Sequence, residues 1–212
     1  MTAPLLELQR LACERDGRTL FSNLHYQVNP GDIVQVLGPN GSGKTTLLRV
    51  ITGISNDFEG ELRWQGLPMA KARLDFRNHL LYIGHLPAIQ RSLTAEENLR
   101  WFSGLDRGHQ QTGISEALKE VGLGGYEDVP CHQLSAGQLR RVALARLFLT
   151  PAMLWILDEP FTAIDTTGVE RLRVLIREHT GGGGAVVLTT HQDLGIDGVK
   201  LLNLLDFQGV AG

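Results

Sequence analysis

Eight consecutive residues in the first quarter of the chain have the composition of a phosphate-binding loop. Residues 38–45 read Gly-Pro-Asn-Gly-Ser-Gly-Lys-Thr, which fits the pattern GxxxxGK(S/T). Glycines let the backbone curl so that several amides face one anion, and a following helix adds its dipole. We expect Lys44 to reach the β- and γ-phosphates of a nucleoside triphosphate, and the Thr45 hydroxyl to bind Mg²⁺. The residues expected to contact the nucleotide here are Gly38, Pro39, Asn40, Gly41, Ser42, Gly43, Lys44, Thr45 and Thr46.

An apolar segment later in the chain ends in two carboxylates. Residues 153–157 read Met-Leu-Trp-Ile-Leu, and Asp158 and Glu159 follow them. A hard dication beside phosphates takes an oxygen ligand at the end of a strand, which suits Asp158, directly or through water. Glu159 is then free to orient and deprotonate an attacking water. The alternative is a buried strand that runs out into a solvated acidic turn, but the phosphate loop upstream favours the catalytic interpretation.

A serine and two small residues begin a helical pattern between these motifs. Residues 134–138 read Leu-Ser-Ala-Gly-Gln. The hydroxyl of Ser135 and the amides near Gly137 and Gln138 could form a second phosphate-binding helix end. One chain needs a single site of this kind for one triphosphate, whereas a head-to-tail dimer needs both, because each nucleotide is then closed by the second chain. The alternative is an ordinary amphipathic helix with Ser135 as its N-cap.

The elements expected around these motifs alternate between strand and helix. The apolar run at 33–37 predicts a strand, and residues 45–51 predict a helix that ends at Gly53. Alternating residues predict strands within the first thirty positions, at 60–66 and at 80–84. The turn residues Pro30-Gly31-Asp32 lead the chain into the strand before the phosphate loop.

The second half of the chain continues this alternation. Residues 94–123 predict mostly helix, interrupted by the polar stretch 104–113, and Thr94 with Glu97 forms a capping-box pattern. Further on, the pattern predicts helix 137–149, strand 153–157, helix 169–180 and strand 185–190, and the glycines at 181–184 end the second of these helices. This βαβ order predicts an α/β fold with a largely parallel sheet and helices on both faces.

Length and composition fit one domain. The 212 residues carry a net charge of −3, which argues against a nucleic-acid-binding surface. The two cysteines, Cys13 and Cys131, lack the spacing of a metal site and suit a reducing compartment. No segment approaches the roughly 18 to 20 apolar residues of a membrane helix, and no signal-peptide pattern is visible. We expect a cytoplasmic protein that does not cross a bilayer by itself.

The order and spacing of these motifs resemble those of ABC ATPases. LSAGQ at 134–138 is similar to the LSGGQ signature, and FTAID at 161–165 and TTH at 189–191 follow the carboxylate strand as in that family. The resemblance implies one nucleotide-binding domain over 1–212, a P-loop ATPase fold whose mostly parallel sheet is flanked by helices. It also implies an antiparallel β subdomain and a helical signature subdomain at approximately 86–150.

The same resemblance assigns roles to two further residues and implies an assembly. Asp165 would lie in a loop that crosses a dimer interface, and His191 would contact the γ-phosphate and hold the water of Glu159. Two chains would sandwich two ATP molecules with Mg²⁺ and hydrolyse them by in-line attack of water.

Three positions depart from the family pattern. The residue that normally offers an aromatic ring to adenine falls near Arg15, whose guanidinium plane can also stack on a purine. The glutamine of the Q-loop falls at His85, whose imidazole can bond water or a phosphate oxygen and titrates near neutral pH. Ala136 replaces the first signature glycine, a small change if its φ is negative.

Several segments narrow the resemblance within the family. Residues 13–16, 19–21, 82–87, 93–99 and 154–165 are similar to the ATP-binding subunits of bacterial cytochrome c biogenesis transporters. This implies a homodimer of ATPase subunits at the cytoplasmic face of the inner membrane, bound peripherally to the integral membrane transporter subunits of the cytochrome c maturation system. Its ATP hydrolysis would be linked to haem export or to release of a haem-loaded chaperone.

Other functions remain as alternatives. A soluble ABC ATPase acting on DNA or ribosomes would usually carry a long coiled-coil insertion or two cassettes, and this chain has one cassette and no basic excess. An ABC importer or exporter subunit for another substrate would share every motif of the nucleotide site. An unrelated phosphate-loop enzyme, such as a small-molecule kinase, would not need the signature or the late histidine.

Overall fold

The N-terminal part of the chain forms an antiparallel sheet. The computed structural model describes residues 3–105 and 113–208. Strands β1 (Leu6–Arg15) and β2 (Arg18–Val28) form a hairpin, and β1 also pairs with β4 (Glu59–Trp64), which in turn pairs antiparallel with β5 (Leu67–Pro68). The strand order in this sheet is β2-β1-β4-β5.

A second sheet, with parallel strands, forms the centre of the molecule. Its strands are β3 (Ile33–Leu37), β6 (Leu80–Ile83), β7 (Leu154–Asp158), β8 (Ala185–Thr189) and β9 (Lys200–Asn203), in the order β6-β7-β8-β3-β9. Every residue of β7 and β8 is buried, as expected for parallel strands covered on both faces. Parallel strands place their carboxyl ends at one edge, so the segments after β3, β7 and β8 come together there.

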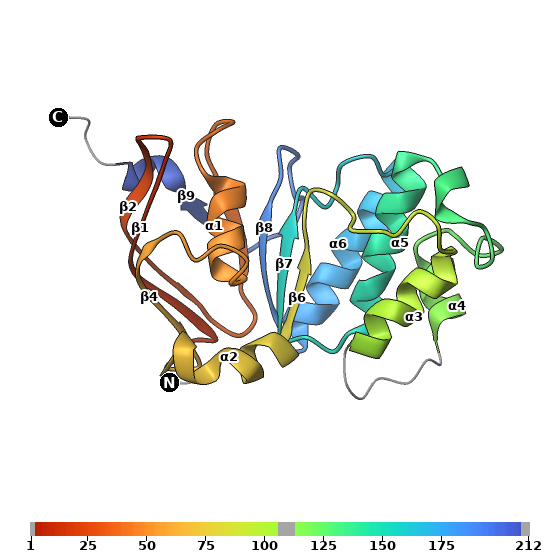
Figure 1. The fold of residues 1–212 in the computed structure, drawn as a ribbon, viewed down its shortest axis with the longest axis horizontal. Helices are drawn as coiled ribbons and strands as arrows, with labels where there is room; N and C mark the ends of the chain where they lie inside the picture. The colour runs from red at the N-terminus through yellow and green to blue at the C-terminus, as the bar shows by residue number, and fades with distance from the viewer. Residues whose placement is uncertain (1–2, 106–112, 209–212) are drawn as a thin grey trace.

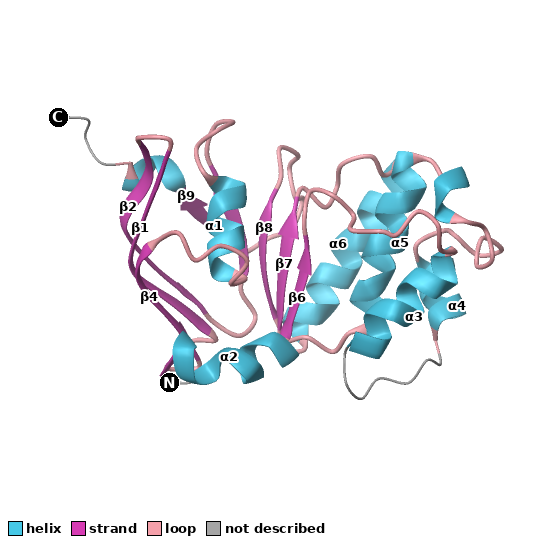
Figure 2. Cartoon of the chain, in the orientation of Figure 1, coloured by secondary structure: helices cyan, strands magenta, loops and turns pink. Residues whose placement is uncertain are grey.

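Helices separate and cover the two sheets. Helix α1 (Lys44–Ile51) lies between the antiparallel and the parallel sheet, and α5 (Ala136–Leu149) and α6 (Thr166–Gly181) lie on the other side of the parallel strands (Figure 1). Beyond them lie α3 (Ala95–Leu105) and α4 (Ile114–Glu120), so that this end of the molecule is helical (Figure 2). The other helices of the described residues are α2 (Met69–Asn78) and the 3₁₀ turns η1 (Cys131–Gln133) and η2 (Leu204–Phe207).

Three buried apolar clusters hold these layers together. One joins the two sheets around α1 and includes Phe21, Leu47 and Trp64. A second lies between the parallel sheet and helices α5 and α6, around Trp155 and Ile176. A third packs α3 and α4 against α5. Burial of these side chains fixes α1 and α5 on opposite faces of the same sheet.

The structure confirms the predicted α/β fold and most of its elements. Strand β3 has the predicted bounds, α6 ends at Gly181, and the Thr94 amide donates to Glu97 Oε2 at 2.8 Å in the expected capping box. Helix α2 and strand β9 were not predicted. The interruption expected at 104–113 falls largely on residues 106–112, which lie outside the described residues.

The period-two pattern expected in β2 is interrupted. Asn23 has φ +49, and the register of β2 against β1 shifts between the pairs Leu11–Leu24 and Cys13–Phe21. An extra residue of this kind reverses which side chains face inward. A strict alternation along β2 would place Phe21 and Leu24 on opposite faces of the strand, whereas the shift allows both to be buried.

Candidate active site

The phosphate loop has a backbone that only glycine can adopt at two positions. Gly38 has φ +151, and a Cβ there would lie 2.3 Å from Ser42 Oγ. Gly43, directly before α1, has φ +99, and its Cβ would lie 3.0 Å from Leu20 Cβ. Larger residues would strain the loop and also displace these neighbours. The glycines thus close the loop tightly at the N-terminus of α1, where backbone amides and the helix dipole favour an anion.

The loop holds its own lysine by backbone carbonyls. Lys44 Nζ donates to the Gly38 oxygen at 2.7 Å and to the Pro39 oxygen at 3.2 Å. The ammonium therefore lies over the curled segment, on the side where phosphate oxygens would compete with these two carbonyls. A charged competitor forms the stronger hydrogen bond.

Asp158 is held at the end of β7 by two hydroxyls. Its side chain is buried, with only 2% of the residue exposed. The Thr45 hydroxyl donates to Oδ2 at 3.0 Å, and the Thr189 hydroxyl, from the neighbouring β8, donates to Oδ1 at 2.7 Å. The carboxylate therefore links the first residues of α1 to the parallel sheet. Its oxygens and the Thr45 hydroxyl form a set of hard oxygen donors.

Glu159 follows with an unusual backbone conformation. Its φ is +51, a left-handed value that is uncommon outside glycine. The amide of Glu159 donates to both the carbonyl oxygen and Oγ1 of Thr189, at 3.2 and 3.0 Å. Glu159 Oε1 lies 3.4 Å from His191 Nε2. The Glu159 side chain is 17% exposed and that of His191 is 63% exposed, so the pair faces an open space rather than the core.

These groups line one cleft of about 660 Å³. The loop before α1, the segments after β7 and β8, and the tip of the β1–β2 hairpin all lie at the upper edge of the view (Figure 1). The cleft brings together many of the residues that the sequence nominated, namely Arg15, Pro39, Asn40, Gly41, Gly43, Lys44, Thr45, Thr46, His85, Asp158, Glu159 and His191.

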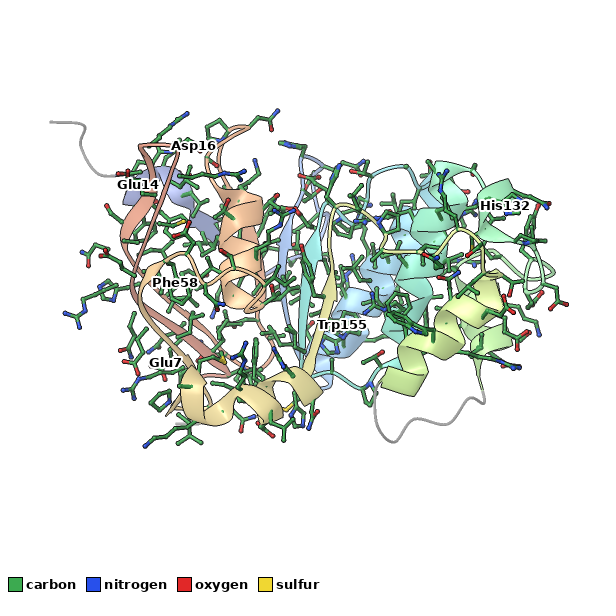
Figure 3. All side chains as sticks on the ribbon, in the orientation of Figure 1. Glu7, Glu14, Asp16, Phe58, His132 and Trp155 are labelled. Atoms are coloured by element: carbon green, nitrogen blue, oxygen red, sulfur yellow. The ribbon has the colours of Figure 1, made fainter. Side chains whose placement is uncertain are left out.

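The tip of the β1–β2 hairpin brings Arg18 into the cleft, a residue that was not predicted from the sequence. Asp16 and Gly17 have φ +53 and +72, a two-residue turn with both residues left-handed, and Asp16 lies at the upper edge (Figure 3). The turn pairs Arg15 with Arg18 across the hairpin, and both arginines line the cleft. An Asp-Gly dipeptide between alternating strands was the signal that could have placed Arg18 opposite Arg15. Thr162 also lines the cleft and was not predicted.

The signature residues lie elsewhere in the same chain. The Gln138 amide donates to Ser135 Oγ at 3.2 Å, and the Ser135 amide donates to Gln138 Oε1 at 2.9 Å, which is a capping box at the start of α5. Asp165 caps α6, because its Oδ1 accepts from the Gly168 amide at 2.9 Å. Of the described residues that line the cleft, none is Ser135, Gly137, Gln138 or Asp165. One chain therefore does not bring its signature to its own phosphate loop.

The two small signature residues differ in how much space they have. Ala136 is exposed and takes a helical backbone, so its φ is negative, as the sequence analysis required. A Cβ at Gly137 would lie 2.5 Å from the Ala163 carbonyl oxygen. Glycine is therefore needed at 137 because the segment between β7 and α6 crosses directly over it, whereas alanine is accommodated at 136.

Among residues 3–105 and 113–208, no helix has both the length and the apolar character to span a bilayer.

Sequence comparison assigns the chain to a family. The family described as ABC transporter matches residues 21–162, which is more than half of the chain. The chain therefore belongs to the ABC transporter family of ATP-binding, ATP-hydrolysing proteins.

Particular relatives are similar over almost the whole length. The chain is 49% identical over 215 residues to the cytochrome c biogenesis ATP-binding export protein CcmA of Saccharophagus degradans, covering 97% of this chain and 95% of that protein. It is 53% identical over 197 residues to the protein of the same name from Escherichia coli strain K12, covering 93% of this chain and 94% of that protein.

Solved structures share the fold. A putative ABC transporter ATP-binding protein from Pyrococcus furiosus superimposes with a TM-score of 0.81 at 27% identity, covering 96% of this chain and 98% of that one. A dimeric ATP-binding cassette in a post-hydrolysis state, bound to ADP and Pi, superimposes with a TM-score of 0.79 at 24% identity, covering 88% of each chain.

Proposed function

We propose that this chain is the ATP-binding and ATP-hydrolysing subunit of a membrane export complex for c-type cytochrome biogenesis. The observation that carries the proposal is the combination of the phosphate-loop cleft with relatives named cytochrome c biogenesis ATP-binding export protein at 49% and 53% identity. Residues 1–212 would act as a single nucleotide-binding domain, with a helical subdomain at approximately 86–150.

The cleft residues fit a nucleoside triphosphate with Mg²⁺. The Thr45 hydroxyl and the Asp158 carboxylate are oxygen donors within 3.0 Å of each other, the ligand type that this ion prefers. These two residues would hold the ion, which when bound neutralises charge on the phosphate oxygens. Lys44 would exchange its two loop carbonyls for the β- and γ-phosphates. Arg15 would stack on the base, and His85 would bond water or a phosphate oxygen.

Glu159 and His191 would carry the hydrolytic step. Their side chains lie 3.4 Å apart at the mouth of the phosphate loop, and both line the cleft. Glu159 would accept the proton of the attacking water while His191 holds that water against the γ-phosphate, so that attack is in line with the leaving diphosphate.

The missing half of the site would come from a second copy of the chain. Ser135, Gly137, Gln138 and Asp165 do not line the cleft of their own chain, and the start of α5 lies across the sheet from α1 (Figure 1). In a head-to-tail homodimer these residues would close the partner's nucleotide. A similar cassette solved as a dimer with ADP and Pi supports dimerisation.

The dimer would work at the cytoplasmic face of the inner membrane. The described residues contain no membrane-spanning helix, so attachment would be peripheral, through the integral membrane subunits of the cytochrome c maturation system. ATP hydrolysis would drive haem export or release of a haem-loaded chaperone. The relatives' names favour this role over a soluble ATPase acting on nucleic acid or ribosomes.

The test is a strain in which the chromosomal gene carries Lys44→Ala. The change removes the only lysine of the phosphate loop and should abolish ATP turnover, while the protein is still made and recruited to the membrane. Haem-stained gels should lose the c-type cytochromes, whereas b-type cytochromes, whose haem is not covalently attached, should remain. Lys119→Ala, at an exposed position on α4, is the matched control and should leave both classes normal.

Normal c-type bands would contradict the haem-pathway proposal, provided that the Lys44→Ala protein is shown to lack ATPase activity and that no second gene copy is present. Membership of the ABC transporter family would be unaffected, because it rests on the sequence match and the fold.

A further inference from the structure

A buried arginine of α5 joins three separate segments beside the cleft. Arg140 is 4% exposed. Its Nη1 donates to the carbonyl oxygens of Gly84 and His85, at 2.6 and 3.3 Å. Its Nη2 donates to those of Asp158 and Glu159, at 2.7 and 2.9 Å. One planar guanidinium thus connects the signature helix, the loop after β6 and the end of β7.

Burial of this cation needs specific compensation. A charge removed from water is costly unless hydrogen bonds compensate for the lost hydration, and here the two terminal nitrogens make those bonds, while the buried Nε has no partner among the described residues. Burial lowers the pKa of Arg140, while the Asp158 and Glu159 carboxylates nearby act in the opposite direction. The acceptors of its two terminal nitrogens are all backbone carbonyls, so the arginine fixes the path of the main chain rather than neutralising one carboxylate.

The contacts with β7 fall on both peptides that flank Glu159. The Asp158 carbonyl belongs to the peptide before the Glu159 Cα, and the Glu159 carbonyl belongs to the peptide after it. A single Nη2 binds both oxygens, while the Glu159 amide is held by Thr189. The left-handed φ of +51 at Glu159 is therefore maintained from both sides.

We infer that Arg140 is a positioning residue for ATP hydrolysis, which aims the Glu159 side chain and the His85 loop by binding the four carbonyls at the ends of β6 and β7. Because Arg140 stands in the second turn of the helix that begins at Ala136, a displacement of the signature end of α5 is transmitted to both segments. The inference rests on the proposed roles of Glu159 and His85 in ATP hydrolysis, and it does not depend on the haem pathway.

Arg140→Lys and Arg140→Gln test the inference in the purified complex that contains the full-length chain. Lysine keeps the positive charge but concentrates its donors on one nitrogen, which cannot span two pairs of carbonyls as the guanidinium fork does. We expect kcat for ATP to fall at least tenfold in both variants. KM should change less than threefold, since Arg140 does not contact the phosphate loop.

Arg171→Gln provides a matched control. Arg171 Nη1 also donates to a backbone carbonyl, that of Glu120 at 2.7 Å, but it links α6 to α4 away from the cleft. Its kcat should stay within twofold of the wild type. If Arg140 only stabilised the fold, its variants would also keep a kcat within twofold of the wild type, once kcat is calculated per folded molecule.

A second measurement separates positioning of Glu159 from a general loss of structure. In single-turnover assays, Arg140→Lys should reduce the rate in the wild-type background but add less than twofold to the loss caused by Glu159→Gln, because both changes remove the same function. Wild-type kcat in Arg140→Lys would overturn the inference. The inference would also be overturned if the rate losses of Arg140→Lys and Glu159→Gln multiplied in the double variant. The same holds if the fall in kcat were matched by a fall in ATP affinity or in the fraction of folded protein.

Discussion

Thr189→Val should destabilise the protein mainly through loss of the hydrogen bond that the hydroxyl donates to Asp158. Thr189 is fully buried, and valine has nearly the same shape, so the substitution opens no cavity. The hydroxyl donates to Asp158 Oδ1 at 2.7 Å, and Asp158 is itself only 2% exposed, so water does not readily replace the missing donor. The Glu159 amide, which also bonds the hydroxyl, keeps the Thr189 carbonyl as its acceptor.

The size of the effect follows from the charge of the acceptor. A hydrogen bond to an ionised group contributes about 1.5–3 kcal/mol, roughly twice a neutral one. We therefore expect the free energy of unfolding to fall by about 2 kcal/mol. For a chain of this length that corresponds to a fall in Tm of about 4–8 °C. The measurement is chemical and thermal unfolding without nucleotide, because a bound ligand would stabilise the folded state and mask the difference.

Thr180→Val supplies the control for the same chemical change. Thr180 is 9% exposed, and its hydroxyl donates at 3.0 Å to the carbonyl of Ile176, one turn earlier in α6. That carbonyl lies within a helix and does not depend on the hydroxyl, so the loss should stay below about 1 kcal/mol. If Thr189→Val destabilises the protein no more than Thr180→Val, the hydroxyl of Thr189 does not hold the Asp158 carboxylate and the reasoning is refuted.

Three other substitutions test side-chain packing at His179 and at the start of α5. His179 stacks on Trp155 with ring centroids 3.7 Å apart, and burial lowers its pKa below the ordinary 6.5. The unfolded chain then binds a proton that the folded chain resists, so this contribution to stability is complete above pH 6.5 and declines as the pH falls toward the folded pKa. Denaturant titrations across pH should lose that slope in His179→Phe, and an unchanged slope would contradict it. Gly137→Ala should cost about 1–3 kcal/mol through the clash with Ala163, and Ala136→Gly less than about 1, as thermal unfolding of both would test.

Apolar runs and glycines made most of the fold predictable from the sequence. The elements that were not predicted, α2 and β9, lack both signals. Strand β3 consists of the apolar run at 33–37, and α6 ends at Gly181, where glycines begin. Helix α2 buries only Ala72 and Phe76, so its helical period is too weak to recognise. Strand β9 has only Leu202 buried and lies at the edge of the sheet, where alternation over so few positions is not distinctive.

The cleft residues that could be predicted from the sequence are those that belong to short motifs with a known chemistry. Lys44, at the start of α1, and Asp158, at the end of β7, belong to short patterns whose chemistry requires those side chains. Arg140 could not be predicted in this way, because α5 also carries Arg141 and Arg146 and their spacing does not tell which guanidinium is buried. Its acceptors lie in the loop after β6 and at the end of β7, so its role exists only after the sheet and α5 have packed.

The sequence left two interpretations of Ser135 open, an N-cap of α5 and a phosphate-binding residue, and the structure is compatible with both. As the N-cap of α5 its oxygen accepts from the Gln138 amide, which satisfies one amide of the first turn. A serine hydroxyl that accepts in this way still has its own proton to donate. Ser135 is exposed, so that donor can face an anion outside the chain while the capping box stays intact. The N-cap and phosphate-binding interpretations are therefore compatible with one geometry of Ser135, and the proposed head-to-tail dimer would not require the capping box to open.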